Sequence, residues 1–203
     1  MRIRTETPKL RVSKSLLDSW LWVFKKDDGY EDFLRTLDHK PMQMNQAMLD
    51  GQRFENCVNG VLDGNPIPED HEWYKGVTTM AEYLEGAQQQ VELYADAVVD
   101  GYPVLLHGIL DYLRAGVIYD CKFSKSYHLN KYLNSSQHPM YLALVPKASR
   151  FEYLSSDGTW MYKEVYPRDI VEPIEVTIHQ FYGWLKQQGL FEYYKIEWSG
   201  KHK

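Results

Sequence analysis

Residues 104–122 contain two apolar runs joined by the short turn Arg114-Ala115-Gly116, and this pattern predicts the two neighbouring strands of a hairpin. Asp111 lies near the end of the first run, and Asp120 lies near the end of the second. A paired hairpin therefore brings the two acids together at one end. Because side chains alternate along a strand, Lys122 lies on the same face as Asp120. Two acids and a lysine in this arrangement are suited to hold a divalent cation against a phosphate.

The bulk properties of the chain exclude several classes of protein. With 203 residues it is long enough for one domain with a sizeable core. Its 2 cysteines are too few for a disulfide framework, a Cys-only zinc site or an iron–sulfur cluster. The net charge of −5 means that any DNA contact must come from local basic groups. No apolar run approaches the roughly 20 residues that span a bilayer, and no signal-peptide core follows the N-terminus, so we expect a cytoplasmic protein.

The rest of the pattern predicts a mixed α/β fold. No linker splits the chain, so we expect one domain, with a helical part over about residues 1–100, a sheet core over about 101–170, and a C-terminal helix and tail over 171–203. We expect a first helix opened by a capping box at Ser15-x-x-Asp18, later helices at 42–62, 78–99, 136–145 and 173–189, and strands at 103–113, 117–124, 149–155 and 159–166.

Asp111, Asp120 and Lys122 fit the hydrolysis of a phosphodiester, which needs a water nucleophile and relief of charge on the non-bridging oxygens. Mg²⁺ or Mn²⁺ provides both when two or three carboxylates hold it and leave positions open for water and substrate. We therefore expect Asp111 and Asp120 to be metal ligands. The Lys122 ammonium would orient the attacking water and oppose charge in the transition state. Cys121 points to the other face of its strand, but its backbone carbonyl is a candidate further ligand.

Two helical segments offer further site residues. Gln137 and Tyr141 lie one helical turn apart and share a face. The Gln137 amide would hold a water, a metal-bound carboxylate or a DNA phosphate, and Tyr141 would stack on or hydrogen-bond to the strand being cut. Upstream, Glu55 is a candidate third carboxylate for the metal, on a helix face that Gly51 leaves open to close approach.

Each of these signals also has a plain structural explanation. An Asp111–Lys122 or Asp120–Lys122 salt bridge at a sheet end requires no catalysis. A glutamine and a tyrosine one turn apart are more often helix surface, and a lone helical glutamate is more often solvated. Asp-x-Lys by itself is uninformative, because a second copy stands at residues 38–40 in a predicted loop.

The segment that follows the second strand is rich in basic and aromatic residues, namely Lys125, Tyr127, His128, Lys131 and Tyr132. Basic groups interleaved with aromatic rings suit single-stranded or frayed DNA. We expect the three basic residues of this segment, together with Tyr141, to contact DNA. A solvated loop has the same composition, so that alternative stays open.

Five elements, taken in chain order, resemble the PD-(D/E)XK nuclease superfamily. Within it they resemble the branch of RecB-type nuclease domains and lambda-exonuclease-like enzymes of phages and bacteria. The ordered set spans residues 13–141 and is fairly specific. Its elements are Ser13-x-Ser15-x-Leu17, Gly51-x-x-Phe54-Glu55, Gly108-x-x-Asp111, Asp120-x-Lys122 and Gln137-x-x-x-Tyr141.

The resemblance implies a restriction-endonuclease-like sandwich with a central mixed β-sheet flanked by helices, and hydrolysis of DNA with Mg²⁺ or Mn²⁺. By position it makes Lys122 the catalytic lysine. It also implies metal ligands and supporting site residues, namely Glu55, Asp111, Asp120, Gln137 and Tyr141. Many RecB-type domains have a histidine where Glu55 stands, and some relatives carry a four-cysteine iron–sulfur group that this chain cannot form.

We therefore expect a metal-dependent deoxyribonuclease, in first place an exonuclease of phage or bacterial recombination or DNA processing. Its expected partner is DNA, single- or double-stranded and most often at ends, in the cytoplasm of a bacterial or phage-infected host cell. A homo-oligomer, or a recombination or helicase partner, is compatible with this expectation; a membrane is not. Two alternatives use the same scaffold: a catalytically silent DNA-binding module, and a protein-interaction protein such as an inhibitor or assembly factor.

Overall fold

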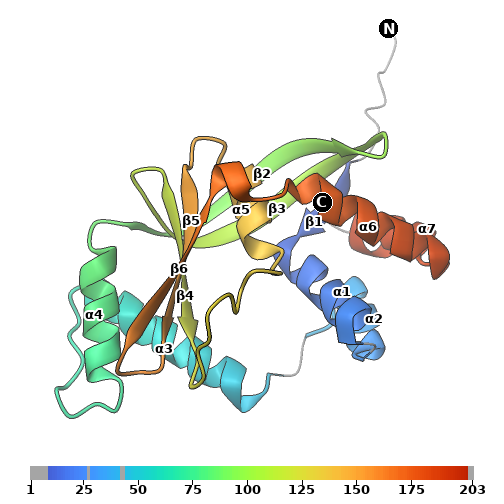
Figure 1. Ribbon diagram of the computed structural model, residues 1–203. Helices are drawn as coiled ribbons and strands as arrows, with labels where there is room; N and C mark the ends of the chain where they lie inside the picture. Colours follow the sequence, from blue (N-terminus) through green and yellow to red (C-terminus); the bar gives the residue numbers. More distant parts are fainter. Residues whose placement is uncertain (1–8, 27, 42–43, 201–203) are drawn as a thin grey trace, which may run out of the picture. The chain divides into compact units, whose positions relative to one another are not determined.

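The computed structural model describes residues 9–26, 28–41 and 44–200 (Figure 1). Its strands are β1 (Leu10–Ser13), β2 (Gln88–Val99), β3 (Tyr102–Arg114), β4 (Val117–Phe123), β5 (Arg150–Ser156) and β6 (Met161–Pro167). Within the described residues these 6 strands form one sheet in the order β1-β3-β4-β5-β6, with β2 also paired to β3. The β1–β3 and β4–β5 pairs are parallel, and the β3–β4 and β5–β6 pairs are antiparallel. The predicted α/β fold with a central mixed sheet flanked by helices is confirmed.

The helices of the described chain are α1 (Lys14–Lys26), α2 (Tyr30–Leu37), α3 (Gln46–Leu62), α4 (Tyr74–Leu84), α5 (Gln137–Leu144), α6 (Ile174–Gln187) and α7 (Phe191–Tyr193), with a 3-10 turn η1 (Arg168–Ile170) and a π-helix η2 (Tyr194–Trp198). The chain folds into two compact units, each built from separate segments of the sequence. The prediction of a single domain with three consecutive parts stays a prediction.

The first unit contains β1, α1, α2, the later part of β2, the first part of β3, α6, α7 and η2. Its core is aromatic. The rings of Trp20 and Phe181 lie 5.3 Å apart, and Phe33 meets Trp184 edge-on at 5.2 Å. Aromatic side chains bury a large apolar area each, so these contacts fix α1, α2 and α6 against one another.

The second unit contains α3, α4, the start of β2, the later part of β3, β4, α5, β5, β6 and η1. An apolar cluster that includes Phe54, Trp73, Cys121 and Leu154 joins α3 and α4 to one face of its sheet. Helix α5 lies against the other face, where it packs on β5. Because both faces are covered, β4 is buried over its first five residues. Cys121 points to the α3 side, as the alternation of side chains predicts, so Asp120 points to the α5 side.

Several predicted elements are confirmed. Strands β3 and β4 match the predicted pair, and the two residues that join them, Ala115 and Gly116, have φ angles of 48° and 74°. Two positive φ angles in succession fit a type I′ hairpin turn. The α3 and α5 helices and the β5–β6 hairpin also form where they were expected. Helix α6 begins directly after Pro173 and ends before Gly189, which has a φ of 69°.

The helix predicted over residues 78–99 is wrong beyond Leu84. Helix α4 ends at Leu84, Gly86 follows with a φ of 75°, and Gln88–Val99 is strand β2. The glutamines, glutamates and alanines of this segment favour a helix when taken one by one. The exposure of its side chains nevertheless alternates from residue to residue, as in a strand, and the segment pairs with β3.

The capping box predicted at Ser15 and Asp18 is also wrong. Helix α1 begins at Lys14, one residue earlier, directly after β1. The backbone N–H of Leu16 donates to Ser13 Oγ at 3.3 Å, so Ser13 satisfies a helix-start donor. Asp18 instead pairs with Lys14 at 2.8 Å along the helix surface. The short strand β1, which was not predicted, ends at Ser13 and sets this earlier start.

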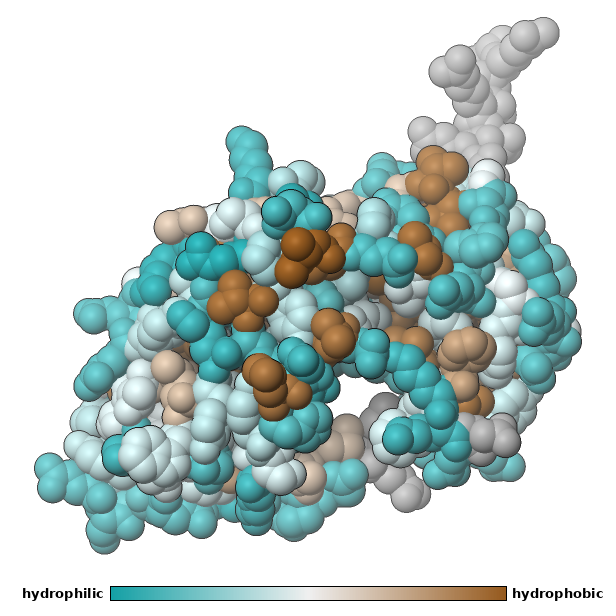
Figure 2. All heavy atoms as spheres, in the orientation of Figure 1, coloured by the Kyte–Doolittle hydropathy of each residue, from teal (hydrophilic) through white to brown (hydrophobic). Residues whose placement is uncertain are grey.

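Exposed apolar side chains are scattered over the surface. On the face that Figure 2 shows, they form separate spots among hydrophilic residues. Of the described large apolar residues, Leu129, Ile170 and Val98 are the most exposed, at 75%, 72% and 70%. Single exposed apolar residues are usual and identify no docking face. Among the described helices, none combines the length and the apolar character that crossing a membrane requires.

We predict that Gly76→Ala destabilises the second unit. The Gly76 N–H donates to the Gly158 carbonyl at 2.9 Å, and a Cβ at Gly76 would lie 2.6 Å from that backbone. Overpacking of this kind costs about 1–3 kcal/mol of unfolding free energy, measurable by urea denaturation. Gly51→Ala is the matched control in the same unit, because a Cβ there meets nothing within 4 Å. In a helix interior that exchange should stabilise by up to about 1 kcal/mol. Equal effects of both exchanges would refute the close contact.

Candidate functional site

Asp120 lies at the centre of the candidate site, on β4, with 1% of its side chain exposed. The side-chain amide of Gln137 donates a hydrogen bond to Asp120 Oδ1, and the Lys122 ammonium lies 2.6 Å from Oδ2. The Lys122 ammonium is thus a partner of Oδ2, and a carboxylate oxygen has a second lone pair for a further ligand. A buried carboxylate oxygen is costly when an ion pair alone compensates its charge. Asp120 therefore keeps one oxygen with acceptor capacity to spare.

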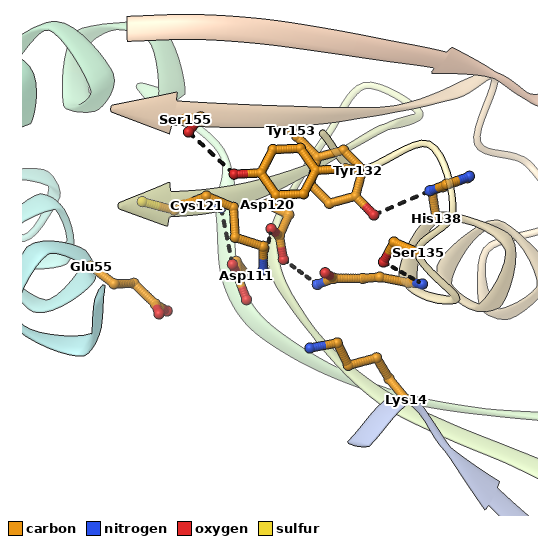
Figure 3. A network of polar contacts seen from close by, with 12 residues as sticks. Lys14, Glu55, Asp111, Asp120, Cys121, Tyr132, Ser135, His138, Tyr153 and Ser155 are labelled. Atoms are coloured by element: carbon orange, nitrogen blue, oxygen red, sulfur yellow. Dashed lines mark hydrogen bonds and ion pairs between the residues drawn. The ribbon is translucent and has the colours of Figure 1, made fainter. Parts of the chain in front are cut away.

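Asp111 reaches the same place from β3. The antiparallel pairing sets Tyr112 opposite Tyr119, so Asp111 and Asp120 follow as the next residues on the two strands. The Cys121 backbone N–H donates to Asp111 Oδ2 at 3.0 Å and fixes that carboxylate. Figure 3 shows the two aspartates side by side. The tight hairpin turn is what brings them together.

The pKa values of two acids of the site, Asp111 and Glu55, are raised. Burial raises the pKa of Asp111 well above its ordinary value, and the charge of Asp120 raises that pKa further. Burial also raises the pKa of Glu55, again with a contribution from Asp120. Each shift means that the ionised form is disfavoured where the carboxylate stands. Acids gathered in this way without a structural need are a common sign of a functional site.

Lys122 is a charged ammonium in this setting. Burial alone would lower its pKa, but the negative charges of Asp120 and Asp111 together outweigh burial and raise the pKa. Part of the side chain, 29%, remains exposed, so the ammonium is within reach of a ligand. Lys122 can therefore act as a fixed positive charge and as a hydrogen-bond donor, and its protonation makes it unsuited to act as a base.

Helix α5 supplies the two predicted supporting residues. Gln137 is its first residue, and the Gln137 N–H donates to Ser135 Oγ at 3.2 Å. Of the partners considered for the Gln137 amide, the structure has a carboxylate, that of Asp120. Tyr141 is buried and donates its hydroxyl to the Ile109 carbonyl at 2.8 Å, so it fastens α5 to β3. A contact of Tyr141 with DNA stays a prediction.

Glu55 lies on α3 and points towards the two aspartates in Figure 3. Its Oε1 accepts a hydrogen bond of 2.9 Å from the side chain of Gln90. Gln90 stands at the start of β2 with a φ of 50°, which is unusual for a residue with a side chain. Gln90 thus holds one oxygen of Glu55 and orients this side chain next to the site. Sequence analysis missed Gln90 because it placed this residue inside a helix.

The predicted DNA-binding cations differ in what they contact. Lys125 is 78% exposed and lies 3.6 Å from Asp50 Oδ2. His128 is exposed, and its Nδ1 lies 3.2 Å from the Leu129 carbonyl oxygen. Lys131 instead uses its ammonium within its own loop, where it donates to the Ser126 carbonyl at 2.7 Å. Lys125 and His128 therefore present more free surface to a polyanion than Lys131 does.

The donor set suits a hard divalent cation, because Mg²⁺ and Mn²⁺ prefer carboxylate oxygens. Among the described residues, no three His, Cys, Asp or Glu side chains are grouped so that they could hold a metal ion. Mg²⁺, however, commonly binds through one or two carboxylates together with waters and substrate phosphates. Asp111 and Asp120, with a spare acceptor on Asp120 Oδ2, fit that pattern. The hydrogen bond from Gln90 uses Oε1 of Glu55 and is compatible with metal binding through Oε2, so Glu55 and the Cys121 carbonyl both stay predicted ligands.

Strand β5 adds side chains that sequence analysis did not assign to the site. The parallel register sets Tyr153 beside Asp120 and Ser155 beside Lys122. The ring of Tyr132 stacks on Tyr153 with centroids 4.4 Å apart, and its hydroxyl lies 3.2 Å from Ser155 Oγ. Tyr132 had a signal, as an aromatic residue in a basic segment. The two β5 residues had none, because the sequence does not show which strand pairs with β4.

Known proteins resemble this chain in fold, and the resemblance does not indicate an activity. The chain matches no family model and no curated protein. Among solved structures it is similar to the protein described as "Crystal structure of SSO0001", with a TM-score of 0.53 and 16% sequence identity. The similarity covers 92% of this chain and 80% of that one. At such low identity the likeness shows a shared α/β architecture alone.

We predict that Asp111→Asn stabilises the protein at neutral pH. Because the folded-state pKa of Asp111 is raised, its ionised form opposes folding above the unfolded pKa of about 3.9. Asparagine keeps an acceptor for the Cys121 N–H and removes the charge. Urea denaturation at pH 7 should show a gain of about 0.5–2 kcal/mol, as for other relieved functional sites. The gain should shrink as the pH falls below about 4, where both states are protonated; a constant gain would contradict this cause.

Proposed function

We propose that this protein is a metal-dependent deoxyribonuclease that hydrolyses DNA phosphodiester bonds. The observation that carries the proposal is the meeting of Asp111 and Asp120 with the Lys122 ammonium, where Lys122 Nζ lies 2.6 Å from Asp120 Oδ2. Two acids and a fixed cation just beyond the paired part of β3 and β4 match the needs of phosphodiester hydrolysis, which are to hold a cation, place a water and oppose phosphate charge.

Each side chain has a part in this chemistry. Asp111 and Asp120 would hold Mg²⁺ or Mn²⁺, which when bound polarises the phosphate and lowers the pKa of a water. Gln137 and the Cys121 N–H keep the two carboxylates oriented. Lys122, charged and partly exposed, opposes the negative charge that builds on the phosphate oxygens in the transition state. Glu55 would join as a further ligand through Oε2, while Gln90 keeps the carboxylate oriented through Oε1.

The electrostatics favour this function over a purely structural salt bridge. An Asp120–Lys122 pair alone explains one acid and one lysine. It does not explain why Asp111 and Glu55 face the same charge with raised pKa values, an arrangement that lowers stability. Acids that lower the folding stability of a protein are expected at sites that bind a ligand or catalyse a reaction. A silent DNA-binding module would keep the pair without the added acids.

The finer parts of the proposal rest on the family resemblance. We place the enzyme among exonucleases of phage or bacterial recombination or DNA processing, acting in the cytoplasm on single- or double-stranded DNA, most often at ends. Exposed Lys125 and His128 are the first candidates for phosphate contacts. A homo-oligomer, or a recombination or helicase partner, would set how far the enzyme moves along DNA.

We predict that Lys122→Ala abolishes DNA cleavage. Asp120 keeps the Gln137 amide as a partner, so the variant should be less stable but still fold, which circular dichroism would check. Loss of one transition-state charge donor typically costs about 10²–10³-fold in rate. The assay combines an end-labelled linear duplex and a closed circular plasmid with Mn²⁺, Mg²⁺ or EDTA. Metal-dependent loss of the linear DNA alone identifies an exonuclease, and nicking of the circle identifies an endonuclease.

The matched control for this assay is Lys163→Ala. Lys163 stands on β6, and its ammonium contacts the Tyr83 hydroxyl at 3.2 Å. It lies beside Leu154, which in turn lies beside Cys121, so it belongs to the opposite sheet face from Asp120. This variant should cleave as the wild type does. If folded wild-type protein cuts neither substrate with either metal, the proposed function is refuted.

A further inference from the structure

Glu164, on β6, is a buried carboxylate outside the acidic cluster, with an exposed fraction of only 6%. Its Oε1 accepts a hydrogen bond of 3.0 Å from the backbone N–H of Lys131, and its Oε2 accepts one of 2.7 Å from the Tyr166 hydroxyl. The backbone N–H of Tyr132 lies 3.5 Å from Oε2 as a weaker third donor. Two of the donors are backbone groups of the loop over residues 124–135, which joins β4 to α5. Glu164 therefore anchors this loop to the sheet.

The anchor lies in the same row of the sheet as the candidate site. Strand pairing sets Glu164 beside Tyr153 and Tyr153 beside Asp120, all on one face. Two strand spacings of about 4.8 Å separate Glu164 from Asp120, so Glu164 is too distant to touch the reacting atoms. Any influence of Glu164 on the site must pass through the side chains between them.

Tyr132 is that intermediate. Its backbone is held at Glu164, while its ring stacks on Tyr153 at 4.4 Å and its hydroxyl lies 3.2 Å from Ser155 Oγ. Ser155 is the strand neighbour of Lys122. Figure 3 shows the Tyr132 ring over the strand segment that carries Asp120. The phenol thus forms a wall of the site next to both the acid and the lysine.

Further contacts also hold the loop over residues 124–135. The rings of Tyr127 and Tyr162 stack at 4.5 Å with an interplanar angle of 10°. Lys131 donates to the Ser126 carbonyl at 2.7 Å. Among these attachments, Glu164 is the group that binds the backbone next to Tyr132. Its two oxygens accept from donors on both sides, whereas a glutamine would place an N–H donor where one of these oxygens stands.

We propose that Glu164 is a positioning residue for phosphodiester hydrolysis, which holds the loop over residues 124–135 so that Tyr132 walls the space beside Asp120 and Lys122. This inference rests on the proposed nuclease function. Glu164 acts by fixing geometry, and Tyr132 is the group that meets the substrate phosphodiester. A loosened wall lets the phosphate and its water leave the reactive arrangement, and a displacement of about 1 Å can cost up to 10²-fold in rate.

The test compares Glu164→Gln with Glu152→Gln. Glu152 is a matched control, because it is buried on the same hairpin but faces the other side, where it accepts from the Tyr83 hydroxyl at 2.8 Å. In Glu164→Gln the backbone amides of Lys131 and Tyr132 should exchange with deuterium about ten-fold faster, because their acceptor is weakened. In Glu152→Gln, exchange in this loop should be unchanged.

Kinetics separate positioning from a general loss of stability. With DNA and Mn²⁺, Glu164→Gln should lower kcat about ten-fold or more and change KM little, as expected when orientation is lost. Glu152→Gln should retain kcat. Tyr132→Phe, which leaves the Glu164 contacts intact and removes the hydroxyl, should lower kcat without faster loop exchange. It is also the variant to use if Glu164→Gln does not fold.

Different outcomes overturn different statements. Unchanged loop exchange in Glu164→Gln, or an equal loss of kcat in both glutamine variants, would refute the positioning role. Full activity of Tyr132→Phe together with full activity of Glu164→Gln would do the same. If the wild type cleaves no DNA, the nuclease proposal fails and so does the catalytic part of this inference. The exchange measurement then decides separately whether Glu164 anchors the loop.

Discussion

The burial of the Asp120 carboxylate is the constraint on which the second unit depends. Asp120 stands on β4, a strand covered on both faces, where an uncompensated charge would cost several kcal/mol. Its compensation comes from two directions, the amide of Gln137 at the start of α5 and the ammonium of Lys122 on the same strand. The position of α5 and the protonated state of the lysine therefore follow from one buried acid.

Two more buried acids use the same physical device on neighbouring strands. Glu164 on β6 collects backbone donors and anchors the loop over residues 124–135, and Glu152 on β5 accepts from Tyr83 of α4. Glu164 thus holds a loop to the sheet, and Glu152 adds a polar contact to a helix that the apolar cluster already covers. Asp111 differs, because its pKa is raised by burial and by Asp120, and it adds strain where the other acids add order. Glu152 and Glu164 therefore have structural contacts, whereas Asp111 is placed where its charge is unfavourable, next to the Asp120 carboxylate.

The apolar cluster on the opposite face of the same sheet stabilises the unit and offsets the destabilising effect of the acidic site. Phe54, Trp73, Leu154 and Cys121 form one buried cluster between the sheet and helices α3 and α4. Burial of apolar area gives roughly 25 cal/mol per Å², enough over a cluster of this kind to offset a locally unfavourable group of acids. One face of the sheet carries the site and the other carries the apolar cluster. Side chains alternate along a strand, so Asp120 lies on the first face and Cys121 on the second.

Local patterns in the sequence determined the hairpin of β3 and β4, the shared face of Asp120 and Lys122, and the opposite orientation of Cys121. A turn and a period of two require only near neighbours, so a single sequence contains them. Tertiary structure alone decided that Gln88–Val99 is a strand. Its residues favour a helix individually, but hydrogen-bonded pairing with β3 makes the segment a strand. It also decided that β5 sets Tyr153 and Ser155 beside the site, and that Gln90 holds Glu55. These contacts join residues far apart in the chain, and their energy comes from packing that no local pattern encodes.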